Sequence, residues 1–250
     1  MNYVRFGSGK KNLVILPGLS VQSVLLSADA VEAVFKDFEQ DFTIYLFDRR
    51  NELPSVCTVQ QLADDMVRVF QSLKLDHLYI FGASQGGMIT LCIASSHPEL
   101  VERICLGSAS ACISDFRIFN TWINHAQNGD AESLYLSFGK EVYPEEVFKQ
   151  SEQLLKDVAK TVTEEELKRF AILAESMRNF DIRNSVQNIR CPALIIGSSD
   201  DRVLGGNSSP TIAQCMSNNP QAKLIMYNGY GHAVYDTAPD FKEHIQKFFA

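Results

Sequence analysis

Ser84 lies in a short glycine-rich stretch whose spacing suits a catalytic nucleophile. The segment Gly82–Gly87 reads Gly-Ala-Ser-Gln-Gly-Gly, directly after the apolar run His77–Phe81 and directly before a helical run, Met88–Ser96. Small flanking residues let a strand and a helix approach closely, and the sharp turn between them lifts a serine hydroxyl clear of a sheet. A coincidental Gly/Ser turn is the alternative. The strand–turn–helix context favours a nucleophile.

A serine hydroxyl is a weak nucleophile and needs a general base. Among the five histidines of the chain, His232 follows the last strand-like run and precedes the terminal helical pattern. That place corresponds to a loop at the carboxyl edge of a sheet, where the sites of open α/β folds gather. We therefore expect His232 to be the base. Structural or solvated roles are expected for the other four histidines: His77, His97, His125 and His244.

The base in turn needs a carboxylate that fixes its tautomer and stabilises the imidazolium. After the strand-like run Ala193–Ile196 the chain reads Gly-Ser-Ser-Asp-Asp-Arg-Val, which offers Asp200 and Asp201 as neighbours. Two adjacent acids often share a turn, with one pointing inward and the other solvated. The residues alone leave both candidates open, and Asp115 and Asp236 are weaker ones.

A tetrahedral intermediate also needs two N–H donors aimed at its oxyanion. The backbone N–H of Gln85, the residue after the nucleophile, is the first candidate. The second is expected in the loop Leu16–Ser20, which follows the first central strand and reads Leu-Pro-Gly-Leu-Ser. There the N–H of Leu19 is the candidate donor. Together these groups predict acyl transfer to water through an acyl-enzyme.

The elements expected to position these groups alternate between strands and helices. The strand-like runs are apolar on both faces, as in a parallel sheet covered by helices on both sides. They are Asn12–Leu16, Phe42–Phe47, His77–Phe81, Arg103–Leu106, Ala193–Ile196 and Lys223–Tyr227. Thr58 and Gln61 form a capping-box signal for a helix. The alternation predicts an open α/β sheet.

One stretch interrupts the alternation. Residues 114–188 contain helical runs, such as Leu154–Lys160 and Glu164–Met177, and no convincing strand. We expect this stretch to be a helical lid inserted into a core formed by residues 1–113 and 189–250. Core packing is the simplest role for each of its aromatic residues, but some of them are expected to line a pocket.

Taken together, these features resemble the α/β-hydrolase superfamily over nearly the whole chain. The elbow at Gly82–Gly87 and the pair Gly231-His232 match that family closely, and the order Ser, Asp, His along the chain is the family's order. The family's acid turn, Gly-x-x-Asp with Val three residues later, matches Gly197–Val203. This alignment selects Asp200 as the acid.

Two other family motifs are only partly kept. Pro17-Gly18 stands where the family has a His-Gly or similar pair in its oxyanion loop. The stretch Asp48–Ser55 keeps the Asp, Arg and Ser of Asp-x-Arg-Gly-x-Gly-x-Ser but loses both glycines. The resemblance implies an α/β-hydrolase fold, a mostly parallel sheet with helices on both faces and a helical lid insertion.

Composition limits the other classes of function. The chain has 250 residues and a formal net charge of −7, which argues against nucleic acid as a partner. No signal peptide and no membrane-length apolar run are seen, and the six cysteines include no Cys-x-x-Cys pair, so a cytoplasmic protein with reduced thiols is expected. No dinucleotide fingerprint or metal-ligand spacing is present, so we expect no cofactor and no metal. Monomer and homodimer are not distinguished.

The expected activity is cleavage of a small carboxylic ester or related acyl compound, a substrate class taken from the family. A thioesterase, C–C hydrolase, lyase or cofactor-free peroxidase of the same fold is the alternative. A non-catalytic ligand-binding member is a hypothesis of another class, against which the complete set of catalytic residues argues.

Overall fold

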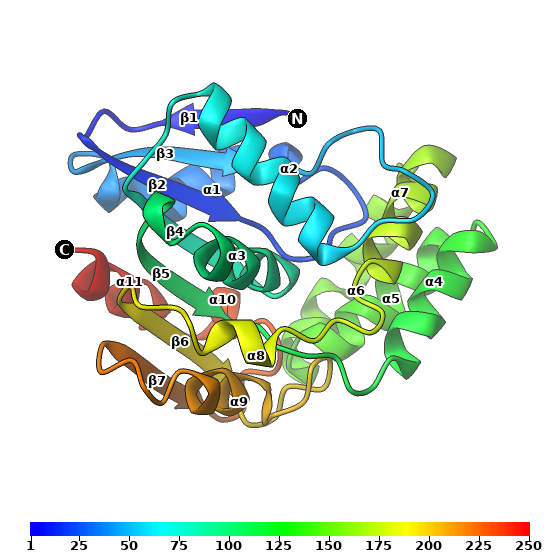
Figure 1. The fold of residues 1–250 in the computed structure, drawn as a ribbon. Helices are drawn as coiled ribbons and strands as arrows, with labels where there is room; N and C mark the ends of the chain where they lie inside the picture. Colours follow the sequence, from blue (N-terminus) through cyan, green and yellow to red (C-terminus); the bar gives the residue numbers. More distant parts are fainter.

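The computed structural model describes residues 1–250 and contains one seven-stranded sheet in the order β1-β3-β2-β4-β5-β6-β7 (Figure 1). Strand β1 pairs antiparallel with β3, and all other pairs are parallel. The strands are β1 (Tyr3–Phe6), β2 (Lys11–Leu16), β3 (Phe42–Phe47), β4 (Leu78–Ala83), β5 (Val101–Gly107), β6 (Ala193–Ser198) and β7 (Ala222–Tyr227). The mostly parallel α/β sheet predicted from the sequence is confirmed.

Successive strand residues point to opposite faces of the sheet. Because the central strands are apolar at consecutive positions, both faces are apolar and both are covered by helices. On one face Val14 and Ile80 pack in the same core as residues of α2 (Val59–Ser72) and α3 (Gln85–Ser96). On the other face Leu13 and Phe81 pack with α1 (Ala28–Phe35) and α11 (Phe241–Phe249). The core also contains α9 (Ser208–Cys215), α10 (Val234–Thr237) and three short 3₁₀ helices, Val24–Ser27, Lys36–Phe38 and Pro98–Leu100, whereas the short helix α8 (Arg183–Val186) lies near the end of the predicted lid segment.

The long connection between β5 and β6 carries the remaining helices. These are α4 (Arg117–Gln127), α5 (Ala131–Val142), α6 (Glu145–Ala159) and α7 (Glu164–Glu175), followed by the short α8. In Figure 1, α4–α7 lie together beyond the carboxyl ends of the strands. An isolated bridge between Cys112 and Asp181 joins the two ends of this segment. None of the helices combines the length and the apolar character that crossing a membrane would require.

The register of the central strands brings their carboxyl ends to one edge. Leu16 pairs with Gly82, and Ala83 and Ile196 both pair with Gly107. The loops that follow β2, β4 and β6 therefore start side by side. This edge lies beneath α4–α7 and carries the residues that the sequence singles out.

Candidate active site

Ser84 occupies a strained turn between β4 and α3. Its φ of 51° and ψ of −117° are rare for a residue with a side chain, and such backbone conformations cost of order 1–3 kcal/mol. Two backbone bonds hold it there: the Ser84 N–H donates to the Gly107 carbonyl at 2.8 Å, and the Met88 N–H donates to the Ser84 carbonyl at 3.1 Å. These two bonds hold the backbone of Ser84 in this rare conformation.

The glycines beside Ser84 are needed because backbone atoms approach them closely. A Cβ on Gly82 would lie 2.6 Å from the Gly86 carbonyl oxygen, and a Cβ on Gly86 would lie 2.0 Å from the Leu16 carbonyl oxygen. Real Cβ atoms do not make such contacts. The first turn of α3 therefore packs directly against the end of β2 and the loop that follows it.

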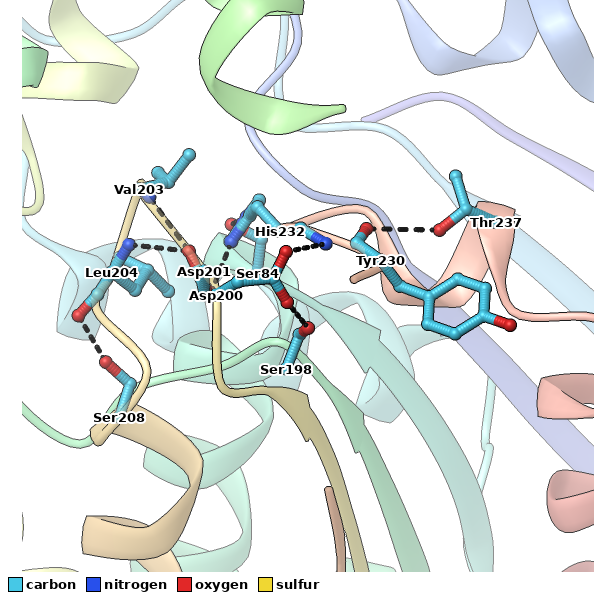
Figure 2. Close-up of polar contacts among 11 residues, drawn as sticks. Ser84, Ser198, Asp200, Asp201, Val203, Leu204, Ser208, Tyr230, His232 and Thr237 are labelled. Atoms are coloured by element: carbon cyan, nitrogen blue, oxygen red, sulfur yellow. Dashed lines mark hydrogen bonds and ion pairs between the residues drawn. The ribbon is translucent and has the colours of Figure 1, made fainter. Parts of the chain in front are cut away.

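Ser84, His232 and Asp201 form a hydrogen-bonded chain. The Nε2 atom of His232 lies 2.9 Å from Ser84 Oγ, and its Nδ1 atom lies 2.8 Å from Asp201 Oδ2 (Figure 2). All three residues are buried, with His232 only 2% exposed. The other carboxylate oxygen of Asp201 accepts hydrogen bonds from the backbone N–H groups of Val203 and Leu204, at 2.8 and 2.9 Å. Both oxygens of Asp201 are thereby satisfied, and the carboxylate is fixed in its place.

The structure brings Asp201, and not the predicted Asp200, to His232. The chain leaves β6 at Ser198 and turns at once, with the Asp201 N–H donating to the Ser198 carbonyl at 3.3 Å. This turn directs the side chain of Asp201 toward the imidazole of His232. It directs the side chain of Asp200 toward the backbone of Gly229 and Gly231. The expected contact between Asp200 and His232 is therefore wrong, because the Gly-x-x-Asp spacing used for the alignment is one residue short of the contact.

Asp200 instead supports the loop that carries His232. Its carboxylate accepts a hydrogen bond from the Ser198 hydroxyl and from the N–H groups of Gly229 at 2.9 Å and Gly231 at 3.1 Å. Both glycines have positive φ, of 88° and 61°. Burial opposes ionisation of Asp200, but these hydrogen bonds together outweigh it and hold the pKa of Asp200 below its ordinary value. Asp200 thus fixes the turn immediately before His232.

The predicted oxyanion donors lie beside the nucleophile. A Cβ on Gly18 would lie 3.3 Å from Ser84 Cβ, so the loop after β2 contacts the nucleophile directly. Leu19 follows in the same loop and is buried, and Gln85 is the first residue of α3. No backbone carbonyl accepts from the N–H of either residue. Neither N–H group is therefore used in a backbone hydrogen bond.

Comparison with known proteins identifies the family of the chain. The model of the family described as alpha/beta hydrolase fold matches residues 11–239. The chain belongs to this family. The resemblance inferred from the sequence is thereby confirmed, and the chain is a hydrolase of the α/β-hydrolase fold.

The relatives of this hydrolase are distant in sequence. One described as "Putative carbamate hydrolase RutD", from Rhizobium rhizogenes, is 27% identical over 223 residues, which are 83% of this chain and 82% of the relative. The crystal structure of MGS-M2, an alpha/beta hydrolase enzyme from a deep-sea metagenome library, has a TM-score of 0.88 at 20% identity and covers 99% of this chain and 93% of its own. The enol-lactonase from Burkholderia xenovorans has a TM-score of 0.83 at 19% identity, with 99% and 95% covered. At these identities the structural matches show the fold alone.

The hydrolase has a small, largely apolar cavity next to Ser84. Its volume is about 20 Å³, which is room for roughly one water molecule. The lining residues come from the core and from α4, α5 and the segment after α7: Leu19, Ser84, Phe119, Trp122, Phe138, Val142, Met177, Val203, His232 and Tyr235. The rings of Trp122 and Phe138 lie 4.7 Å apart between centroids. The segment predicted to be a lid therefore supplies half of the cavity wall.

A second, wider groove lies away from this chemistry. It has a volume of about 420 Å³ and lies at the amino ends of β6 and β7, where Arg103, Lys223 and Phe248 are among its lining residues. It contains none of Ser84, Asp201 and His232. We therefore place the candidate active site in the smaller cavity.

The remaining candidates for catalytic roles do not join the hydrogen-bonded chain of Ser84, His232 and Asp201. The four other histidines each pair with a carboxylate: His77 with Glu102, His97 with Glu99, His125 with Asp130 and His244 with Asp240. Asp115 is exposed and pairs with Arg117, and Asp236 makes no hydrogen bond to His232. No group of three or more His, Cys, Asp or Glu side chains is placed to hold a metal ion.

Proposed function

We propose that this hydrolase cleaves a small carboxylic ester or related acyl compound through an acyl-enzyme formed on Ser84. The observation that carries the proposal is the imidazole of His232, which lies 2.9 Å from Ser84 Oγ on one side and 2.8 Å from Asp201 on the other. A nucleophile, a base and an orienting carboxylate in hydrogen-bond reach are the arrangement that serine hydrolases of unrelated folds share. Asp201 replaces Asp200 as the acid of the proposed triad.

In the first half of the reaction, Ser84 Oγ attacks the carbonyl carbon of the substrate and its proton passes to Nε2 of His232. The N–H groups of Leu19 and Gln85 stabilise the oxyanion of the tetrahedral intermediate. As the intermediate collapses, His232 gives this proton to the leaving oxygen. The alcohol departs and the acyl group remains bonded to Ser84.

In the second half, water replaces the alcohol. His232 takes a proton from the water, whose oxygen attacks the acyl carbon and forms a second tetrahedral intermediate. Collapse of this intermediate returns the proton to Ser84 Oγ and releases the carboxylic acid. Throughout, Asp201 accepts a hydrogen bond from Nδ1–H of His232 and stabilises the imidazolium.

We further propose that residues 114–188 act as a lid on a core of residues 1–113 and 189–250. A cavity of about 20 Å³ is far smaller than even a short ester, so the walls contributed by α4 and α5 must move before substrate enters. The apolar lining favours a short, uncharged acyl group once the lid has closed. A small-molecule substrate and a cytoplasmic location remain part of the proposal.

A carbamate is a second candidate substrate. The relative from Rhizobium rhizogenes and several others, at 22–27% identity, are described as putative carbamate hydrolases. A carbamate has the same electrophilic carbonyl as an ester, and attack by Ser84 would give a carbamoyl-enzyme in place of an acyl-enzyme. The site described here provides the same groups for both reactions.

A panel of esters of graded acyl length, each with a matched carbamate, tests the proposal when assayed with the wild type and with Ser84→Ala. We expect short esters or carbamates to be cleaved, and Ser84→Ala to lose roughly 10⁴-fold or more in kcat. If the folded wild type cleaves none of them although Ser84 reacts with a fluorophosphonate, the ester and carbamate assignments fail. A thioester, C–C bond, lyase or peroxidase substrate of the same fold would then replace them.

A further inference from the structure

Arg49 contacts both segments of the chain that are proposed to form the oxyanion hole. This residue follows β3 and is buried, with 3% of its surface exposed. One nitrogen of its guanidinium, Nη2, donates to the Pro17 carbonyl at 2.7 Å and to Gln85 Oε1 at 3.3 Å. Pro17 belongs to the loop that carries Leu19, and Gln85 carries the second proposed donor. A single nitrogen thus bridges the two segments that form the oxyanion hole.

The guanidinium of Arg49 is not placed as a structural ion pair would be. Its Nε and Nη1 atoms are buried and have no hydrogen-bond partner, which is a costly arrangement for a cation. The carboxylate of Asp48 accepts instead from Arg169 Nη2 at 2.9 Å and from the backbone N–H of Arg49 at 2.6 Å. A purely stabilising role would be expected to pair these groups more completely.

Arg49 remains a cation at neutral pH. Burial lowers the pKa of its guanidinium to about 10, an effect that the nearby Asp48 opposes and Arg169 adds to. The hydrogen bonds to Pro17 and Gln85 are therefore charge-assisted and stronger than those of a neutral donor.

The lid holds the same glutamine from the opposite side. The amide nitrogen of Gln85 donates to the Leu173 carbonyl at 2.7 Å and to Ser176 Oγ at 3.3 Å, both at the carboxyl end of α7. Gln85 is fully buried, so its side chain lies between Arg49 in the core and α7 above it. The position of the first residue of α3 is thus set by contacts on both sides.

We propose that Arg49 is a positioning residue that holds the N–H groups of Leu19 and Gln85 at the separation an oxyanion requires. This inference rests on the proposed acyl-enzyme reaction. The two donors come from loops more than sixty residues apart in sequence, so only tertiary contacts fix their separation. Arg49 is a side chain that binds both loops at once, through Pro17 and Gln85.

The test uses Arg49→Met, Arg49→Lys and the matched control Arg50→Met. Arg50 follows Arg49 in the chain but pairs with Asp65 at 3.1 Å, away from the oxyanion loop. Each variant is titrated with a fluorophosphonate to count active sites. Its kcat and KM are then measured with the best ester or carbamate. Its Kd for an alkyl boronic acid, which forms a tetrahedral anion on a catalytic serine, and its Tm are measured as well.

We expect Arg49→Met to lose roughly 10- to 100-fold in kcat with KM within about threefold of wild type, because transition-state stabilisation is lost and ground-state binding is not. The boronic acid Kd should rise by a similar factor. A lysine keeps the positive charge, but its shorter side chain holds the ammonium farther from both acceptors, so Arg49→Lys should give a smaller loss of the same kind. Arg50→Met should keep kcat and the boronic acid Kd of the wild type.

A folded Arg49→Met that keeps the wild-type kcat and boronic acid Kd overturns the inference, as does an effect confined to Tm or to KM. If Arg49→Met does not fold, the same criteria applied to Arg49→Lys decide. The proposed function fails in a different way, because a folded wild type would then cleave none of the esters and carbamates, whether or not Ser84 reacts with the fluorophosphonate. An active wild type with unaffected Arg49 variants defeats only the positioning role.

Discussion

The two sides of the site differ in how completely their polar groups are paired. One side, called the relay side below, is formed by the loops after β6 and β7 and contains Asp201 and His232. There Asp201 accepts hydrogen bonds from His232 and from the backbone N–H groups of Val203 and Leu204, all at 2.9 Å or shorter. On the oxyanion side, formed by the loops after β2 and β3 and the start of α3, no backbone carbonyl accepts from the N–H of Leu19 or Gln85. Two buried nitrogens of Arg49 there are also without a partner.

This difference indicates which part of the site is complete before substrate arrives. A satisfied relay orients its proton acceptor in the resting enzyme. A buried donor without a partner costs of order 1–3 kcal/mol, a cost that a negatively charged intermediate would remove. Interactions made only with the transition state are the ones that raise kcat. We therefore interpret the relay as preformed and the oxyanion side as the place where charge development is recognised.

The largest expected effect separates the two adjacent carboxylates of the relay side. Asp201→Asn removes the acceptor for Nδ1–H of His232 and should lower kcat by roughly 10⁴-fold. Asp200→Asn only weakens the turn at Gly229–Gly231, so we expect a loss of no more than about 10-fold in kcat and about 1–3 kcal/mol in unfolding free energy. Steady-state kinetics and denaturant titration of both variants measure this. The reverse order of the two activities would return the acid role to Asp200.

The next effect is on the oxyanion side. Gly86→Ala places a Cβ 2.0 Å from the Leu16 carbonyl oxygen, so the loop with Leu19 must shift away from α3. We expect a loss of roughly 10²-fold in kcat, as for a lost oxyanion donor, while the relay stays intact. Gly129→Ala is the control, since its Cβ would meet nothing within 4 Å and its only cost comes from the positive φ of 73° at that position. Equal kinetics for the two variants would show that the approach of α3 to this loop is not needed.

A smaller effect concerns the lid wall, where specificity should change while the reaction does not. Phe138→Ala removes a ring that packs on Trp122 and lines the cavity, so longer acyl chains should gain roughly 10-fold in kcat/KM relative to short ones. Phe148→Ala on α6 is the matched control, because Phe148 is an aromatic residue of the lid that does not line the cavity. The graded ester panel gives the ratio for both variants. An unchanged ratio in Phe138→Ala would argue against this wall as the acyl site.

The smallest effect is on stability in acid. The pKa of folded Asp200 lies below its ordinary value of 3.8, so its ionised form stabilises the fold above that pH and the contribution is lost as the pH falls toward the folded value. Asp200→Asn lacks this titration. Its unfolding free energy should therefore fall less steeply than that of the wild type below about pH 4.5, by under about 1 kcal/mol in total. Denaturant titrations between pH 3 and pH 7 measure the two slopes, and parallel slopes would contradict the assigned pKa direction.

The fold could be predicted from the sequence because strand burial leaves a direct mark in it. The six apolar runs coincide with β2 to β7, and the capping box of Thr58 and Gln61 starts α2 as expected. Strand β1 was not predicted. It is four residues long and pairs antiparallel at the edge of the sheet, and the charged Arg5 interrupts its apolar residues, so no continuous apolar run marks it.

The candidate site was predictable to the extent that local sequence sets its geometry. The turn at Ser84 and the loop at His232 are defined by small residues next to them in the chain. The choice between Asp200 and Asp201 depends on which way the turn after Ser198 directs each side chain, and composition and spacing do not record this. The sequence does not indicate a role for Arg49, for a similar reason. It stands in the partly kept family stretch Asp48–Ser55, but its contacts with Pro17 and Gln85 exist only in the folded chain.

The central claim is that Ser84 is the activated nucleophile of a preformed relay. Reaction of the folded protein with a fluorophosphonate, followed by mass spectrometry of its peptides, tests this most directly. We expect a single adduct on the peptide that contains Ser84, formed far more slowly in His232→Ala and absent in Ser84→Ala. A folded wild type that stays unlabelled, or an adduct on another residue, would contradict it.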